Sequence, residues 1–149
     1  MSGDRDALRA WLALLGTANA IKKGVDMRLK QRFGLSLARF DVLAALDRAG
    51  EAGLTAGGLT AWLKVTEGNT TQVTAPLVAA GLVERRTGAN DKRVAIFRLS
   101  AEGRTLFAAM AAENRRWIDG AFAALGPAEI AQLRALLGAL QPPFEKEAA

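Results

Sequence analysis

Residues 54–99 read LTAGGLTAWLKVTEGNTTQVTAPLVAAGLVERRTGANDKRVAIFRL. Capping residues and apolar spacing predict two helices in this stretch, over residues 56–63 and 66–80. Two strand-like runs follow, over residues 82–86 and 94–99, joined by a turn that contains glycine and ends in charged residues. The stretch therefore predicts a helix-turn-helix followed by a two-stranded hairpin, the wing.

The second of these helices has an unusual exposed face. Its buried side is set by Thr70, Val73 and Leu77, which recur at steps of three and four. The opposite side and the first turn carry small or polar residues with one charge among them: Thr66, Glu67, Gly68, Asn69, Thr71, Gln72 and Ala75. Ordinary helix surfaces usually carry Lys and Glu, whereas Asn, Gln and Thr can contact base edges or phosphates in the major groove. We therefore favour DNA readout over an ordinary polar surface.

The predicted wing carries four cations, Arg85, Arg86, Lys92 and Arg93. A basic hairpin tip can enter the minor groove of DNA, where negative potential attracts arginine. Most charged hairpin tips are simply solvated, but this one directly follows the helix with the base-reading face. The order of the two elements favours a shared DNA-binding surface.

Pro76 lies inside the helix predicted over residues 66–80, where proline is unfavourable. Proline inside a helix removes one backbone hydrogen bond and costs about 3 kcal/mol. The carbonyl of Gln72 would lose its partner, so we expect a kink between Gln72 and Pro76.

Apolar stripes predict that the flanking sequence is helical, over residues 5–31, 37–48, 100–125 and 127–141. We therefore expect a mainly α fold with a small two-stranded β wing (α+β), in which long N- and C-terminal helices flank a winged helix-turn-helix. The length of 149 residues fits a single domain, 1–149. Within it we expect a DNA-binding lobe at 36–99 and a helical dimerisation region at 5–33 and 100–141.

The chain contains no cysteine and no histidine. This excludes thiol redox sensing, Cys- or His-ligated metal, and nucleophilic catalysis by Ser-His or Cys-His pairs. No acidic cluster stands out, so we expect no catalytic residue, no metal site and no cofactor. The net charge of +5 divides into +4 over residues 1–33, +2 over 34–99 and −1 over 100–149. A polyanion-binding surface in the first two-thirds would require this distribution, although many other proteins share it.

No secretory signal is recognisable, because the apolar run 10–21 is short and lacks a small-residue cleavage site. No run approaches the roughly 18–20 apolar residues that a membrane span requires. We therefore expect a cytoplasmic protein without a membrane partner.

A ligand pocket is a further hypothesis. Its candidate lining residues are Trp11 and Leu15 of the first helix, Phe40 of the second and Trp117 of the long helix after the wing. Aromatic residues at helical spacing more often belong to the hydrophobic core, so a purely structural role for these four residues remains an alternative to the ligand pocket.

Four motifs together resemble the MarR-type winged helix-turn-helix regulators. They are Leu54–Leu63 followed by Val65-Thr66-Glu67-Gly68-Asn69-Thr70-Thr71, then Gly81-Leu82-Val83-Glu84-Arg85-Arg86, Asp91-Lys92-Arg93 and Leu99-Ser100-Ala101-Glu102-Gly103. The third is similar to the family's Asp-x-Arg wing signature, and the fourth to the Leu-Thr-x-x-Gly opening of its next helix. With the flanking helices, the resemblance covers nearly the whole chain.

The resemblance implies roles for individual residues. Arg93 would reach the minor groove and Asp91 would brace the wing, while Thr66, Asn69, Thr71 and Gln72 would face the major groove. It also implies a homodimer and an effector such as a small aromatic acid or thioester, bound between the dimer helices and the DNA-binding lobe. Pro76 departs from the basic or polar residue more usual there, so a phosphate contact is in doubt.

Together these observations predict a dimeric, sequence-specific DNA-binding transcriptional regulator, a ligand-responsive repressor that acts on a pseudo-palindromic operator. Two alternatives remain open. An architectural DNA-binding protein would bind many sequences alike and respond to no effector, and a winged-helix adaptor would contact protein and bind DNA only weakly. An enzyme is a distant fourth, because the residues for catalysis are missing.

Overall fold

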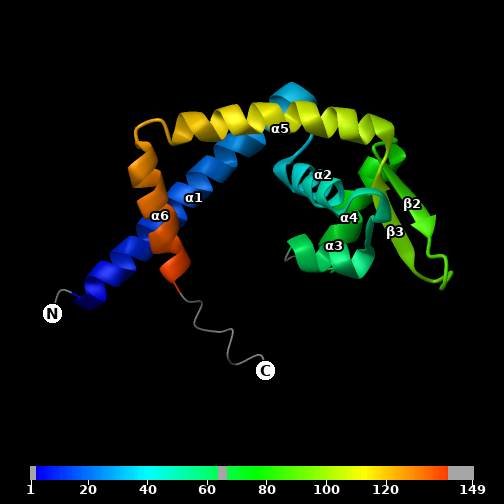
Figure 1. Cartoon of the computed structure of the whole chain (residues 1–149), viewed down its shortest axis with the longest axis horizontal. Helices are drawn as coiled ribbons and strands as arrows, with labels where there is room; N and C mark the ends of the chain where they lie inside the picture. The colour runs from blue at the N-terminus through cyan, green and yellow to red at the C-terminus, as the bar shows by residue number, and fades with distance from the viewer. Residues whose placement is uncertain (1–2, 64–66, 141–149) are drawn as a thin grey trace. The chain divides into compact units, whose positions relative to one another are not determined.

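The computed structural model describes residues 3–63 and 67–140 (Figure 1). In chain order its elements are α1 (Gly3–Phe33), α2 (Leu37–Ala49), the 3-10 turn η1 (Gly50–Ala52), β1 (Leu54–Thr55), α3 (Ala56–Leu63), α4 (Glu67–Ala79), β2 (Val83–Thr87), β3 (Ala95–Leu99), α5 (Ala101–Ala121) and α6 (Pro127–Ala139). The mainly α fold with a β wing is thereby confirmed.

The sheet differs from the prediction in the number of its strands. The strand order is β1-β3-β2, and both pairings are antiparallel. The expected hairpin is β2–β3, with Val83 opposite Leu99 and Thr87 opposite Ala95. The third strand, β1, pairs Leu54 with Phe97 and was not predicted, because two residues show no alternation that a sequence pattern could detect.

By its internal contacts the chain divides into two compact units, residues 1–115 and 116–149, with the boundary inside α5. The predicted lobe 36–99 lies within the first unit. The assignment of 5–33 and 100–141 to dimerisation stays a prediction. No helix among residues 3–63 and 67–140 is both long and apolar enough to cross a membrane.

The core of the first unit is built around α2, which Figure 1 shows beside α3, α4 and the sheet. Phe40 of α2 packs against Phe107 of α5, with ring centroids 5.5 Å apart. The side chains that are almost completely buried come from six elements: Leu29, Val42, Leu43, Leu46, Leu59, Leu77, Val83 and Met110. The helix-turn-helix and the wing are therefore fixed to α1, α2 and the first part of α5 by one apolar core.

Serine side chains cap two of the helices. Ser36 Oγ accepts a hydrogen bond from Arg39 N at 3.3 Å at the start of α2. Ser100 Oγ accepts one from Gly103 N at 3.0 Å and donates to the carbonyl of Gly81 at 2.6 Å. Ser100 thereby connects Gly81, in the turn between α4 and β2, to the first turn of α5.

α4 continues through Pro76 to Ala79, and the N–H of Ala80 donates to the carbonyl of Pro76 at 3.0 Å. The expected kink between Gln72 and Pro76 stays a prediction.

Candidate nucleic-acid interface

Buried threonines set the rotation of α4 about its axis. Thr70 and Thr74 are each 3% exposed, and Leu77 beside them is 1% exposed. Thr74 Oγ1 donates to the carbonyl of Thr70 at 2.5 Å, and the hydroxyls of Thr60 in α3 and Thr70 lie 3.0 Å apart. Because buried hydroxyls are costly unless hydrogen-bonded, these contacts hold one face of α4 against the protein.

The opposite face of α4 is open to solvent. Thr71, Gln72 and Ala75 are exposed, as their positions in the helix predicted. Glu67, Gly68 and Asn69 form the first turn of α4, and their side chains, together with all of Thr66, lie outside the described residues. The described part of this face therefore presents a hydroxyl and an amide but no charge.

Arg85 brings the wing to the same side of the molecule as α4. A cavity of about 430 Å³ between α4 and the hairpin is lined by Thr71, Thr74 and Ala75 from the helix and by Arg85, Ala95 and Phe97 from the strands. The Arg85 side chain is exposed. One face of α4 and one face of the wing thus border the same cavity, whose lining is mainly apolar and includes the exposed residues Thr71 and Arg85.

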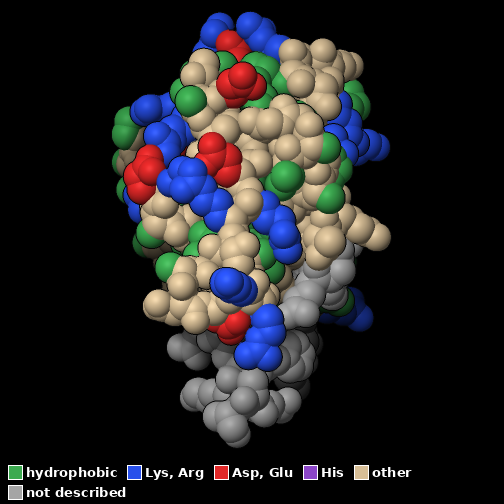
Figure 2. Space-filling view, turned by 90° about the vertical axis from the view of Figure 1, so that its right-hand side faces the viewer, with side chains coloured by type: hydrophobic (Ala, Val, Ile, Leu, Met, Phe, Trp, Pro, Cys, Tyr) green, Lys and Arg blue, Asp and Glu red, His purple; other side chains and the backbone are tan. Residues whose placement is uncertain are grey.

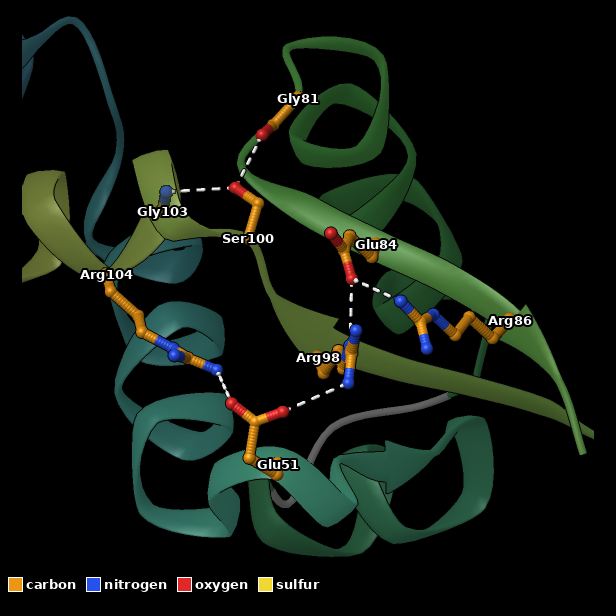
Figure 3. A network of polar contacts seen from close by, with 8 residues as sticks. All are labelled: Glu51, Gly81, Glu84, Arg86, Arg98, Ser100, Gly103 and Arg104. Carbon is orange, nitrogen blue, oxygen red and sulfur yellow. Dashed lines mark hydrogen bonds and ion pairs between the residues drawn. The ribbon is translucent and has the colours of Figure 1, made fainter.

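Arg86 lies on the other face of the wing, since successive side chains of a strand point to opposite faces. Its Nη2 atom lies 3.4 Å from Glu84 Oε2 (Figure 3). Glu84 in turn accepts a hydrogen bond from Arg98 Nε at 2.8 Å. Four wing cations were predicted to act together, but Arg85 and Arg86 have different surroundings.

The tip of the wing is closed by backbone contacts around Asp91. Gly88 N donates to the carbonyl of Val94 at 2.7 Å, and Val94 N donates to the carbonyl of Asp91 at 3.1 Å. Asp91 Oδ1 accepts from Arg93 N at 2.9 Å and lies 3.4 Å from Arg93 Nε. The Arg93 side chain is nevertheless 93% exposed, so it is oriented at its base and free to reach outward.

Charge on the wing side is mixed. Figure 2, which faces this side, shows Lys and Arg side chains spread over the surface, several of them beside Asp or Glu. Arg86 is paired with Glu84 and Arg93 with Asp91, whereas Arg85 and Lys92 form no ion pair with another described residue. These two side chains are available to a polyanion without breaking an internal pair.

The four residues predicted to line a ligand pocket differ in their exposure to solvent. Trp11 and Leu15 on α1 are 53% and 39% exposed, and Phe40 is buried against Phe107. Trp117 is half-buried and belongs to the second compact unit. None of the four lines either cavity described here, so the aromatic pocket stays a prediction.

A second cavity, of about 520 Å³, lies between α1 and the start of α2. Its polar lining includes Lys22, Lys23, Asp26 and Asp41. Removal of water around the carboxyl raises the pKa of Asp41, and the charge of Lys22 opposes this shift. No sequence pattern indicated this cavity, because its lining comes from α1, the start of α2 and Leu63 of α3, whose packing a single sequence does not reveal.

Sequence comparison identifies relatives of this region. The family model described as the MarR family matches residues 33–94. The HTH-type transcriptional regulator PetP of Rhodobacter capsulatus is 34% identical over 93 residues, which are 62% of this chain and 56% of PetP. The aligned part thus spans little more than half the length of that curated relative.

Solved structures share the fold. Sco3205 of Streptomyces coelicolor, a MarR family transcriptional regulator solved in complex with DNA, is 22% identical with a TM-score of 0.81 and covers 93% of this chain and 90% of its own. BpsR of Bordetella bronchiseptica, whose DNA binding is regulated by 6-hydroxynicotinic acid, is 21% identical with a TM-score of 0.76, over 87% of this chain and 96% of its own. The match to the MarR family model, over residues 33–94, thus covers the helix-turn-helix and β2, where the motifs predicted this resemblance, and it ends before β3.

Proposed function

We propose that this protein is a sequence-specific, DNA-binding transcriptional regulator and not an enzyme. The observation that carries the proposal is the cavity shared by α4 and the wing, which exposed Thr71 and Arg85 both line, with Gln72 also exposed on the same helix. Uncharged hydrogen-bonding groups are suited to reading base edges, and arginines are suited to phosphates and the minor groove. The MarR family match over the same residues supports it.

The reading surface is assigned to Thr66, Glu67, Gly68, Asn69, Thr71 and Gln72 on the helix-turn-helix and to Arg85, Lys92 and Arg93 on the wing. Asp91 orients Arg93 through its backbone and side-chain contacts. Arg86, which was expected on this surface, is paired with Glu84. A protein of this kind acts where the DNA is, so we place it in the cytoplasm.

We further propose a homodimer. Large apolar side chains are exposed along α1, where Leu8, Trp11 and Leu12 are 53–56% exposed, and on α6 and its C-cap, where Leu136 and Leu140 are 59% and 60% exposed. Burying such side chains in a second copy is favourable by about 25 cal/mol per Å². Two recognition helices about one turn of DNA apart (~34 Å) would then read a pseudo-palindrome.

We further propose that this protein is a repressor, and that binding of a small aromatic acid or its thioester releases it from DNA. It is supported by the ligand response of BpsR and by the cavity between α1 and α2, where Lys22 and Lys23 suit a carboxylate. The aromatic set Trp11, Leu15, Phe40 and Trp117 is the other candidate site. A thermal-shift series with aromatic acids and thioesters, on the protein and on Lys22→Ala, separates the two: stabilisation lost in that variant selects the lysine cavity.

The test of DNA binding is selection of duplexes from a random pool, followed by titration at several salt concentrations. We expect one enriched pseudo-palindrome, and Arg93→Ala should weaken binding to it and lower the slope of log K against log salt by about 0.9. Equal binding to all duplexes would indicate an architectural protein, and weak binding without preference an adaptor. Either result would overturn the proposal.

A further inference from the structure

Five charged side chains form a cluster on the face of the wing that carries Arg86. We call it the Arg98 cluster; its members are Glu51, Glu84, Arg86, Arg98 and Arg104, all shown in Figure 3. Arg98 and Glu84 are directly opposite in the β2–β3 register. Arg98 Nε donates to Glu84 Oε2 at 2.8 Å, and Arg98 Nη1 donates to Glu51 Oε2 at 3.1 Å.

Arg98 is the centre of this cluster. Its side chain is 22% exposed, compared with 72% for Glu51 and 59% for Arg86. Glu51 comes from η1, and its second oxygen accepts from Arg104 in α5. One planar guanidinium group therefore connects β3 to β2 and η1 directly, and to α5 through Glu51.

The position of β2 in the sheet makes these contacts important for the orientation of the wing. β2 is an edge strand whose only strand partner among the described residues is β3. On its other side β3 is paired with β1 over just two residues, Leu54 and Thr55. The hairpin therefore has little sheet to hold its direction, and the Arg98 cluster links it to elements outside the sheet.

We propose that Arg98 is a positioning residue, which sets the direction of the wing against η1 and α5, and that Glu84, not a phosphate, is the partner of Arg86. The proposal rests on the DNA-binding function proposed above. Arg98 acts on DNA through the placement of Arg85 and Arg93, and touches no DNA itself. Because arginine presents a rigid fork that binds two acceptors at once, lysine cannot replace it.

The absence of cysteine allows a direct measurement of wing position. Two labels are introduced at exposed sites of the first unit, Ala89→Cys at the wing tip and Asp47→Cys on α2. Electron spin resonance of nitroxides at these sites gives their distance distribution, with an excess of unlabelled protein to suppress distances between copies. The same full-length proteins are titrated with the duplex selected by the unaltered chain.

Arg98→Met should broaden the label distance distribution and weaken DNA binding about threefold to tenfold, with the salt slope unchanged. Arg86→Met is the matched control, since it removes the same charge from the same face; it should leave both distribution and slope unchanged. Arg85→Met should instead lower the slope by about 0.9 and leave the distribution unchanged. Arg98→Lys keeps the charge and should still broaden the distribution, which tests the proposal if Arg98→Met does not fold.

An unchanged distance distribution in both Arg98 variants overturns the positioning role. A salt slope lowered by about one in Arg98→Met overturns that role as well, because Arg98 would then contact a phosphate. The same change in Arg86→Met overturns the assignment of Glu84 as the partner of Arg86. Failure of the unaltered chain to select any duplex contradicts the proposed function instead. The label distances are measured without DNA and so test Arg98 in either case.

Discussion

Leu82 and Gly103 meet so closely that the carbonyl oxygen of Leu82 occupies the space that a Cβ atom at position 103 would need. Gly103 is buried in the first turn of α5, and Leu82 immediately precedes β2. The same carbonyl accepts a hydrogen bond from Ser100 N at 3.0 Å. The base of the wing and the start of α5 are therefore joined through backbone, and only glycine permits the approach.

Gly103→Ala should accordingly lower the free energy of unfolding by about 1–3 kcal/mol, because a methyl group must be forced into packed backbone. Gly120→Ala in the same helix is the matched control: a Cβ atom there would meet nothing within 4 Å. Alanine favours helix over glycine by up to about 1 kcal/mol, so the control should be neutral or stabilising. Urea unfolding at one protein concentration compares them, and equal stability of the two variants would contradict the contact.

Asp26 caps a helix to which it does not belong. Its Oδ1 atom accepts a hydrogen bond from the N–H of Leu37, the first residue of α2, at 2.8 Å, and its Oδ2 atom lies 2.9 Å from Lys30 Nζ. Asp26→Ala should cost about 0.5–2 kcal/mol of unfolding free energy, the usual cost of a lost cap. Asp26→Asn keeps an oxygen acceptor and should retain part of this, as measured by thermal or urea unfolding.

The Arg98 cluster should also be visible in the dependence of stability on pH. The hydrogen bond from Arg98 holds the pKa of Glu84 below its ordinary value of 4.5. A carboxyl whose pKa is lower in the folded state stabilises fully above the unfolded value and loses this stabilisation as pH falls through the folded value. The free energy of unfolding should therefore be higher for the unaltered protein than for Glu84→Gln near neutral pH, and this difference should shrink as the pH falls below 4.5. If the difference in unfolding free energy between the two proteins did not change with pH, the pair of Arg98 and Glu84 would be excluded as a source of stability.

Sequence patterns predicted the elements that depend on nearby residues. The bounds of α3, Ala56–Leu63, match the prediction, and serines at positions 36 and 100 cap the helices that follow them. The exposure of Thr71 and Gln72 followed from helical periodicity alone. The alternation of side chains along Val83–Thr87 also places Arg85 and Arg86 on opposite faces of the strand. The four wing cations were nevertheless treated as one group.

Tertiary contacts account for what the sequence could not predict. Glu51 and Arg98 are 47 residues apart, and nothing local to either indicates that η1 and β3 will meet. The cap that Asp26 provides depends on how α1 packs beside α2. Gly53 shows the same limit: it has a φ of 68° and lies against the Phe97 carbonyl, but a sequence shows it only as the end of a helix.

Gln72 offers the sharpest test of base reading, because its amide is exposed on α4 and carries no charge. If it contacts a base edge, Gln72→Ala should reduce the discrimination between the selected duplex and a mixed-sequence duplex by about 1–3 kcal/mol. Binding to the mixed sequence and the salt slope should both stay unchanged, since no phosphate contact is removed. Gln31→Ala, the same substitution at an exposed position in the last turn of α1, is the control and should alter neither affinity. If Gln72→Ala weakened binding to both duplexes equally, Gln72 would contact the DNA backbone. Residues in the first turn of α4 would then have to make the contacts that recognise the DNA sequence.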